Sequence, residues 1–448
     1  MLRLALPLIL AELAWMSMGI VDTMMVGHLA NSAEAIGGAS LAGVIFSVAG
    51  IFGIGLLMGM DTLVAQSFGA GNLEDCNKSL WNMIYLTLPL APVLMGLVGL
   101  SLFLLHRFGI NPGVESVAEP YMRLLTWSML PLLLYSGFRR YLQAVDNVRP
   151  VPFVLISANV INFVGNWLLI YGKFGFPAMG TQGSALSTVI ARIYMAAAMF
   201  IFVLRHDRRN GSGLWRVSRQ PEFQRMWRLL RIGFPAAGQI AFEIGVFSFA
   251  TAIVAKLDAR SLAAHQIALS AVSFTYVVPL GISSAAAVRV GQALGRGDLA
   301  GARQQGWIAV RLALGFMGGA AIVLLAAPTL IARFFTPDPL VIAASTSLLA
   351  IAAMFQLFDG AQVVATGALR GMGDSHTAAI VNLVAYWFIG IPAGWVLCFD
   401  YGWGARGVWA GLCIGLVLIG TALLWTWQRK TRTWTCNTDF TLSPGTRH

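Results

Sequence analysis

The chain has 448 residues, of which 57% are hydrophobic and only 11% are charged. A soluble protein carries about 25% charged residues, so this chain lacks the polar side chains needed to cover a water-facing surface, and lipid must surround most of it. The net charge of +11 does not indicate nucleic-acid binding, because the basic residues lie in short breaks between apolar runs. We therefore expect an all-α integral membrane protein.

Twelve apolar runs follow one another along the chain, and each is long enough to span the hydrocarbon core of a bilayer. In the first half we expect helices at 4–27, 37–68, 80–105, 120–144, 150–171 and 183–204. In the second half we expect them at 226–257, 263–294, 306–335, 340–369, 375–399 and 405–427. The first run is too long for a signal-peptide core, so we interpret it as a spanning helix.

The two halves of the chain repeat one another. The second run ends in VAQSFGAGNL at 64–73, and the eighth ends in VGQALGRGDL at 290–299. Six helices separate the copies, so the halves have the same orientation, as in transporters whose halves are related by an axis along the membrane normal. We expect a six-helix bundle over 1–204, a cytoplasmic basic linker over 205–225, a second six-helix bundle over 226–428 and a cytoplasmic tail over 429–448. In such a duplicated bundle the substrate site is expected between the halves.

The basic residues predict the orientation in the membrane. The even-numbered breaks are richer in arginine and lysine than the odd-numbered ones, and the sixth is the richest. It holds Arg205, Arg208, Arg209, Arg216, Arg219, Arg225, Arg228 and Arg231. Because positively charged loops stay in the cytoplasm, we expect both termini to be cytoplasmic in a cell inner (plasma) membrane.

Five acidic residues lie inside apolar runs: Glu12, Asp22, Asp61, Glu243 and Asp359. An ionised carboxylate in the centre of a bilayer costs about 2.5–3.5 kcal/mol on insertion scales. These side chains must therefore face the protein interior or a water-filled cavity, carry a proton, or bind a cation.

Glu243 and Asp359 are the strongest candidates for coupling to an ion gradient, because both lie well inside runs of the second half. A carboxyl group enclosed by apolar helices can take up a proton on one side of the membrane and release it on the other. It can equally hold Na⁺ or a cationic substrate. The alternative is a structural carboxylic acid that is satisfied by a neighbouring helix.

Asp22 and Asp61 are the next candidates. Asp22 lies near the extracellular end of the first helix, where the alternative is a polar residue that reaches the interface. For Asp61 a structural hydrogen bond is as plausible as a part in transport. Glu12 has no assigned role, and pairing with a neighbour would explain it.

Other polar and aromatic side chains are candidates for lining a substrate cavity. Asn159, Asn162 and Asn166 share one face of the fifth helix, where amides can also join helices by hydrogen bonds. His265 is more often a packing group than a ligand. The remaining candidates are Gln239, Gln266, Phe355, Phe358 and Tyr386, of which the aromatic residues would suit an organic cation.

Five segments together resemble the MATE family of multidrug and toxin extrusion transporters. They are VDTMMVGHL at 21–29, QSFGA at 66–70, AHQI at 264–267, VRVGQALG at 288–295 and GALRG at 367–371. The resemblance covers nearly the whole chain. It implies that Glu243 corresponds to the family's helix-7 glutamate, Asp359 to the helix-10 aspartate of the NorM-like branch and Asp22 to the helix-1 aspartate, acids that couple cation influx to drug export in the family.

Two departures from the family pattern bear on the coupling ion. Some Na⁺-coupled NorM-like members have a tyrosine four residues before the acid of the tenth helix, and here that position is Phe355. Asp61 and its two successors look more like the eukaryotic-type members, which resemble proton antiporters. Both features favour H⁺, and Na⁺ at Glu243 and Asp359 stays open.

The sequence thus predicts a secondary antiporter, monomeric and without a cofactor, that exports organic cations in exchange for H⁺ or Na⁺. A flippase for lipid-linked oligosaccharides or lipids is the alternative, although it would need a basic interior. A membrane enzyme is not expected, because the six histidines are scattered and no nucleophile motif or metal-spaced cluster occurs.

Overall fold

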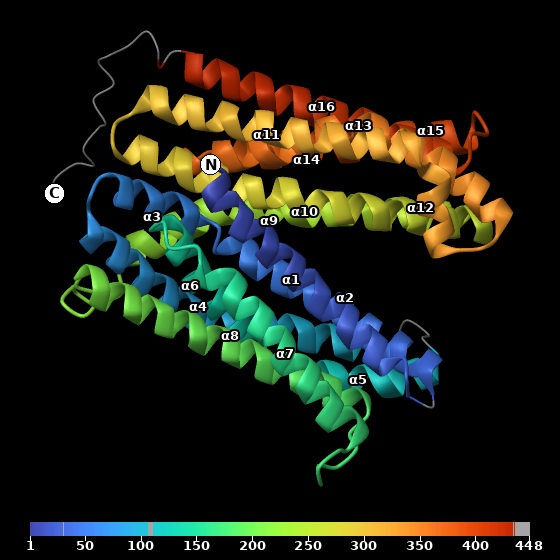
Figure 1. Cartoon of the computed structure of the whole chain (residues 1–448), viewed down its shortest axis with the longest axis horizontal. Helices are drawn as coiled ribbons and strands as arrows, with labels where there is room; N and C mark the ends of the chain where they lie inside the picture. Colours follow the sequence, from blue (N-terminus) through green and yellow to red (C-terminus); the bar gives the residue numbers. More distant parts are fainter. Residues whose placement is uncertain (30, 106–110, 433, 435–448) are drawn as a thin grey trace. The chain divides into compact units, whose positions relative to one another are not determined.

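The computed structural model describes residues 1–29, 31–105, 111–432 and 434, and these residues form helices and connecting turns (Figure 1). The first half contains α1 (Leu2–Val26), α2 (Ser32–Leu56), α3 (Gly59–Gly69), α4 (Leu73–Leu105), α5 (Pro112–Thr126), α6 (Met129–Ala144), α7 (Pro150–Tyr171) and α8 (Thr181–Asn210). The second half contains α9 (Phe223–Val254), α10 (Ala259–Gly295), α11 (Leu299–Ala326), α12 (Pro328–Phe335), α13 (Pro339–Gly371), α14 (Ser375–Asn382), η2 (Leu383–Gly390), α15 (Ile391–Phe399) and α16 (Ala405–Arg432). Most of the tail expected at 429–448 lies outside the described residues.

Eleven segments are long and apolar enough to cross a membrane. The twelfth span is the pair α5 and α6, which are separated only by Trp127 and Ser128. The all-α fold of twelve membrane helices is therefore confirmed, and three of the expected single helices are interrupted.

Each interruption has a local cause. The run expected at 120–144 divides at Trp127 and Ser128, because Pro131 cannot donate a helical hydrogen bond to the Trp127 carbonyl. The run expected at 37–68 divides at Leu57 and Met58, next to Gly55 and Gly59, where another backbone approaches closely. The run expected at 306–335 divides before Pro328, whose ring cannot continue a helix. The run at 375–399 is continuous but passes through the π-helical turns of η2.

The chain forms two compact units, and they do not coincide with a simple cut between the halves. The first-half unit comprises Leu10–Phe68 and Asn72–Ala237. The second-half unit comprises Met1–Ile9, Gly69–Gly71 and the chain from Gly238 onward. The first residues of α1 thus belong to the second-half unit and the rest of α1 to the first-half unit. The first residues of α9 belong to the first-half unit and the rest of α9 to the second-half unit.

Glycines accommodate these helix beginnings. In the second-half unit, a Cβ on Gly281 would lie 2.5 Å from the Ile9 side chain. In the first-half unit, a Cβ on Gly55 would lie 2.6 Å from the Ala237 Cα atom. Only glycine permits such close approach of two helices.

The repeat predicted from sequence is visible in backbone geometry. Gly71 and Gly297 both adopt φ of 75°. The amides that follow them, of Asn72 and Asp298, each donate to the carbonyl five residues earlier at 2.9 Å, which closes the preceding helix in the same way. Asn72 then caps α4, and Asp298 caps α11.

The segment between α8 and α9 is fastened to α4 and is not a free tether. Four side chains of α4 bond to its backbone: Asn77 to Ser212 (2.7 Å), Trp81 to Leu214 (3.1 Å), Tyr85 to Arg219 (2.8 Å) and Asn82 to Glu222 (2.7 Å). The basic segment thereby belongs structurally to the first-half unit.

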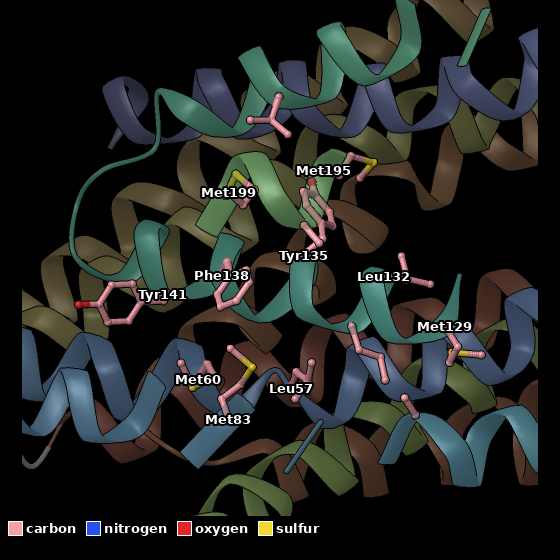
Figure 2. Packing of buried hydrophobic residues seen from close by; sticks show 14 of the residues in the cluster. Leu57, Met60, Met83, Met129, Leu132, Tyr135, Phe138, Tyr141, Met195 and Met199 are labelled. Carbon is pink, nitrogen blue, oxygen red and sulfur yellow. The ribbon is translucent and has the colours of Figure 1, made fainter. Parts of the chain in front are cut away.

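Each unit has its own apolar core. Methionines are prominent in the first-half unit, where Met60, Met83, Met195 and Met199 are fully buried among aromatic and leucine side chains (Figure 2). In the second-half unit the largest buried side chains include Phe355, Tyr386, Trp409 and Trp427. These cores fix the helices that carry the polar groups described next.

Candidate functional site

Glu243 and Asp359, the two acids that the sequence singled out for ion coupling, lie close together inside the second-half unit. The Gln362 side-chain amide donates to Glu243 Oε1 at 3.2 Å and to Asp359 Oδ1 at 3.5 Å. The Asp359 side chain is buried, with 4% of its residue surface exposed, and Glu243 is half-buried. One amide therefore links a carboxyl group of α9 to a carboxyl group of α13.

Other polar groups border this pair. Tyr276 of α10 lies near Glu243. One helical turn earlier on α9, the Gln239 amide is 3.5 Å from the Thr366 hydroxyl. Tyr386, from the π-helical η2, is fully buried and meets Phe247 edge to face. π-Helical turns occur often at functional sites, because they displace side chains from the regular helical position.

Asp22 lies at the centre of a second polar cluster, within the first-half unit. Its Oδ1 accepts a hydrogen bond from Asn166 at 2.6 Å, and its Oδ2 accepts one from Thr188 at 3.1 Å. Asn162, one turn before Asn166 on α7, completes the cluster with long contacts of 3.4 Å to both partners. The structure therefore unites Asp22 with two of the three asparagines singled out in the sequence.

Asn159, the third asparagine of that face, does not join the cluster. Its amide donates to the carbonyl oxygens of Ala14 (2.8 Å) and Leu155 (2.9 Å), and so ties α7 to α1.

A cavity of about 190 Å³ opens beside Asp22. Its polar lining includes Asp22, Tyr121, Thr188 and Arg192. Arg192 was missed from the sequence because only acidic residues were considered, although a cation inside the run at 183–204 carries a comparable insertion cost. That charge is the signal that identifies it.

Asp61 and Glu12 each form an ion pair with an arginine of α6. Arg140 Nη1 lies 2.5 Å from Asp61 Oδ2, and Arg139 pairs with Glu12. The sequence left both structural and transport roles open for Asp61, and its partner here is a fixed side chain of the same unit.

The remaining candidates in the second half lie apart from the two acids or have other contacts. His265 Nδ1 accepts from the Trp409 indole at 2.9 Å, and Nε2 lies 2.9 Å from the Thr251 hydroxyl. Both ring nitrogens are thus engaged. Phe355 stacks on Trp409 and belongs to the same buried group. Gln266 is exposed and Phe358 is half-buried.

No group of three or more histidine, cysteine, aspartate or glutamate side chains suitable for a metal ion occurs within the described parts of the chain. The two acid sites are instead built from carboxyl groups, amides and hydroxyls. Such groups can carry a proton or offer oxygen atoms to a monovalent cation.

Comparison with known proteins agrees with this architecture. The MatE family model matches twice, over residues 7–168 and 235–396, which are the two repeats. The chain is 34% identical over 442 residues to a protein of Mesorhizobium japonicum named "Probable multidrug resistance protein NorM", covering 96% of this chain and 93% of that one. A protein of Pseudomonas putida with the same name is 34% identical over 438 residues, covering 96% of this chain and 94% of that one.

Solved structures show the same fold at lower identity. A eukaryotic MATE transporter superposes with a TM-score of 0.85 at 22% identity, with 96% of each chain covered. A transporter of the MOP superfamily from Pyrococcus furiosus superposes with a TM-score of 0.85 at 17% identity, covering 97% of this chain and 96% of that one. The double family match and the near full-length relatives together establish that this chain belongs to the MatE family.

Proposed function

We propose that this protein is a secondary antiporter that exports organic cations in exchange for H⁺ or Na⁺. The family and the full-length relatives named as multidrug resistance proteins support the efflux of small molecules. The observation that carries the coupling is the pair Glu243 and Asp359, which share the Gln362 amide inside apolar helices.

The shared amide gives the pair a chemical basis for exchange. A single side-chain amide cannot neutralise two carboxylates, so the pair gains stability when it also holds a proton or a cation. An organic cation that approaches the same negative charge competes with that ion. Release of one upon binding of the other is the elementary event of antiport.

Asp22 provides a comparable acid in the other half. The Asn166 amide and the Thr188 hydroxyl, which donate to it, stabilise a carboxylate without neutralising it. In this proposal Asp22 takes up the coupling ion as well. Phe355, which stands where some Na⁺-coupled family members have a tyrosine, favours H⁺ as that ion.

The setting of this activity is a bacterial-type inner membrane. The eleven apolar helices and the interrupted α5–α6 pair span it, and the excess of basic residues in the even-numbered breaks supports a cytoplasmic location of both termini. The protein acts as a monomer on small organic substrates, with no nucleic acid or organic cofactor.

The deciding experiment is transport in liposomes with either a pH gradient or a Na⁺ gradient imposed alone. The wild type is expected to move a fluorescent organic cation uphill under one of the two gradients. Glu243→Gln combined with Asp359→Asn is expected to reduce uphill transport to the level of protein-free liposomes, because neither residue can then carry the coupling charge.

Glu74→Gln is the matched control, since its side chain is 64% exposed at the start of α4. It should transport as the wild type does. Uphill transport by the double variant at the wild-type rate would overturn the coupling assignment, and equal transport without any gradient would indicate a passive pathway.

A further inference from the structure

Arg192 is a cationic residue inside an apolar membrane helix, and the proposed ion-coupling role of the acids does not account for its presence there. It lies on α8 and lines the cavity beside Asp22 in the first-half unit. Arg139 and Arg140, which are also largely buried in that unit, each pair with a carboxylate of their own. Arg192 has none within ion-pair distance among the residues that the structure describes.

Neutral groups hold Arg192 in place. Its Nη1 donates to the Ser128 hydroxyl at 2.6 Å, at the break between α5 and α6. Its guanidinium carbon lies 4.6 Å from the centre of the Phe46 ring, a cation–π contact. These contacts fix the position of the guanidinium group without neutralising its charge.

The guanidinium group has unused hydrogen-bonding capacity. Its Nε is buried and has no hydrogen-bond partner in the described part of the chain. Asp22, which lines the same cavity, accepts its hydrogen bonds from Asn166 and Thr188 and not from Arg192. The cavity therefore presents a carboxylate and a guanidinium group that are held by different neighbours.

We propose that this cavity recognises zwitterionic substrates, with an anionic group on Arg192 and a cationic group on Asp22. The planar, always charged guanidinium group suits a carboxylate, which it can bind through two parallel hydrogen bonds. The same charge repels a purely cationic molecule from the cavity. Arg192 is thus a specificity-determining residue for the transported compounds, an inference that rests on the proposed function.

A matched pair of dyes tests the proposal. Rhodamine 123 is the methyl ester of rhodamine 110, so the two share a cationic ring system and differ in one free carboxylate. Their equilibrium dissociation constants for the detergent-purified protein can be measured by fluorescence anisotropy. Arg192→Leu is expected to raise the dissociation constant of rhodamine 110 by about tenfold, which corresponds to the loss of one charge-assisted hydrogen bond. The dissociation constant of rhodamine 123 should stay the same or fall.

Three further variants make the result interpretable. Arg192→Lys keeps the positive charge but loses the two parallel N–H donors of the guanidinium group. It should weaken the binding of rhodamine 110 by less than Arg192→Leu does. Arg123→Leu is the control, because that arginine is 71% exposed and pairs with Glu119. If Arg192→Leu does not fold, Ser128→Ala removes one anchor of the guanidinium group and should still weaken rhodamine 110 selectively.

The outcomes separate this inference from the antiport proposal. Equal weakening of both dyes, or no change in either, by the Arg192 variants would overturn the zwitterion site. Selective weakening of rhodamine 110, together with no gradient-driven transport of either dye by the wild type, would uphold the site and overturn antiport.

Discussion

Buried charges in this protein are of two kinds, those with a fixed partner and those without one. Asp61 and Glu12 each pair with an arginine of α6. Glu243, Asp359 and Asp22 accept hydrogen bonds only from neutral side chains in the contacts described above. The paired acids suit a structural role, and the acids with neutral partners suit a role in which a mobile charge arrives and leaves.

Breaking the Asp61–Arg140 pair tests its structural role. Both side chains are buried, with 2% and 10% of their surface exposed. Arg140→Met leaves the Asp61 carboxylate inside the unit without its counter-ion, and should lower the free energy of unfolding by about 3–5 kcal/mol. Unfolding in mixed detergent micelles, followed by circular dichroism, measures the change.

The double variant Asp61→Asn with Arg140→Met serves as the comparison. It removes both charges and should cost less than Arg140→Met alone. If Arg140→Met is as stable as the wild type, the ion pair does not contribute to stability. Asp61 is then again a candidate for a role in transport.

Sequence reasoning singled out the acids of both candidate sites and some of their polar neighbours, such as Asn162 and Asn166, but not which side chains contact which. Glu243, Asp359 and Asp22 stand out because a charge inside an apolar run is costly wherever the run packs. Their partners are distant in the chain: Gln362 is 119 residues from Glu243, and Asn166 is 144 from Asp22. Only the folded structure reveals which polar side chains meet.

At the scale of the helices, hydrophobicity predicts the spans, and packing decides where they bend. The interruption at Pro328 has a sequence signal, since proline removes a helical hydrogen bond, although Pro89 and Pro92 are accommodated inside α4. The interruption at Trp127 and Ser128 has the same kind of signal, because Pro131 cannot donate to the Trp127 carbonyl, and it places the Ser128 hydroxyl against Arg192.

Close packing of α15 against α16 gives a testable consequence. A Cβ on Gly411 would lie 2.4 Å from the Gly394 backbone. Gly411→Ala should therefore force the helices apart and lower the free energy of unfolding by about 1–3 kcal/mol, as overpacking does. Detergent unfolding of the purified protein measures it.

Gly315→Ala is the control within α11, because a Cβ there would meet no other described atom within 4 Å. It should be neutral or stabilise the protein by up to about 1 kcal/mol through helix propensity. Equal effects of the two substitutions would show that propensity, and not the contact with Gly394, determines the result.

At the scale of the whole chain, a repeated scaffold carries unequal chemistry. The helix ends at Gly71 and Gly297 match in dihedral angle and in hydrogen bonding. The acid sites do not match, since one half offers Asp22 among asparagines and the other offers two acids that share a glutamine. The repeat was predictable because helix ends are short local motifs, whereas the sites depend on side chains from several helices.

The proposed orientation can be tested with reporters on intact cells. Green fluorescent protein fused after His448 should fluoresce, because it folds only on the cytoplasmic side. Alkaline phosphatase inserted after Phe176, between α7 and α8, should be active, because it requires the periplasm. The reverse pattern of the two reporters would invert the topology.

The exchange of helix beginnings between the two compact units has a consequence for biosynthesis. Helices α1 to α8 are synthesised before α9, so Gly55 at first lacks the Ala237 backbone that packs against it in the folded unit. The start of α1 likewise cannot pack through Ile9 until Gly281 of α10 has been synthesised. The first eight helices cannot complete the first-half unit by themselves, so they must remain able to rearrange within the bilayer at least until α9 and α10 have been synthesised.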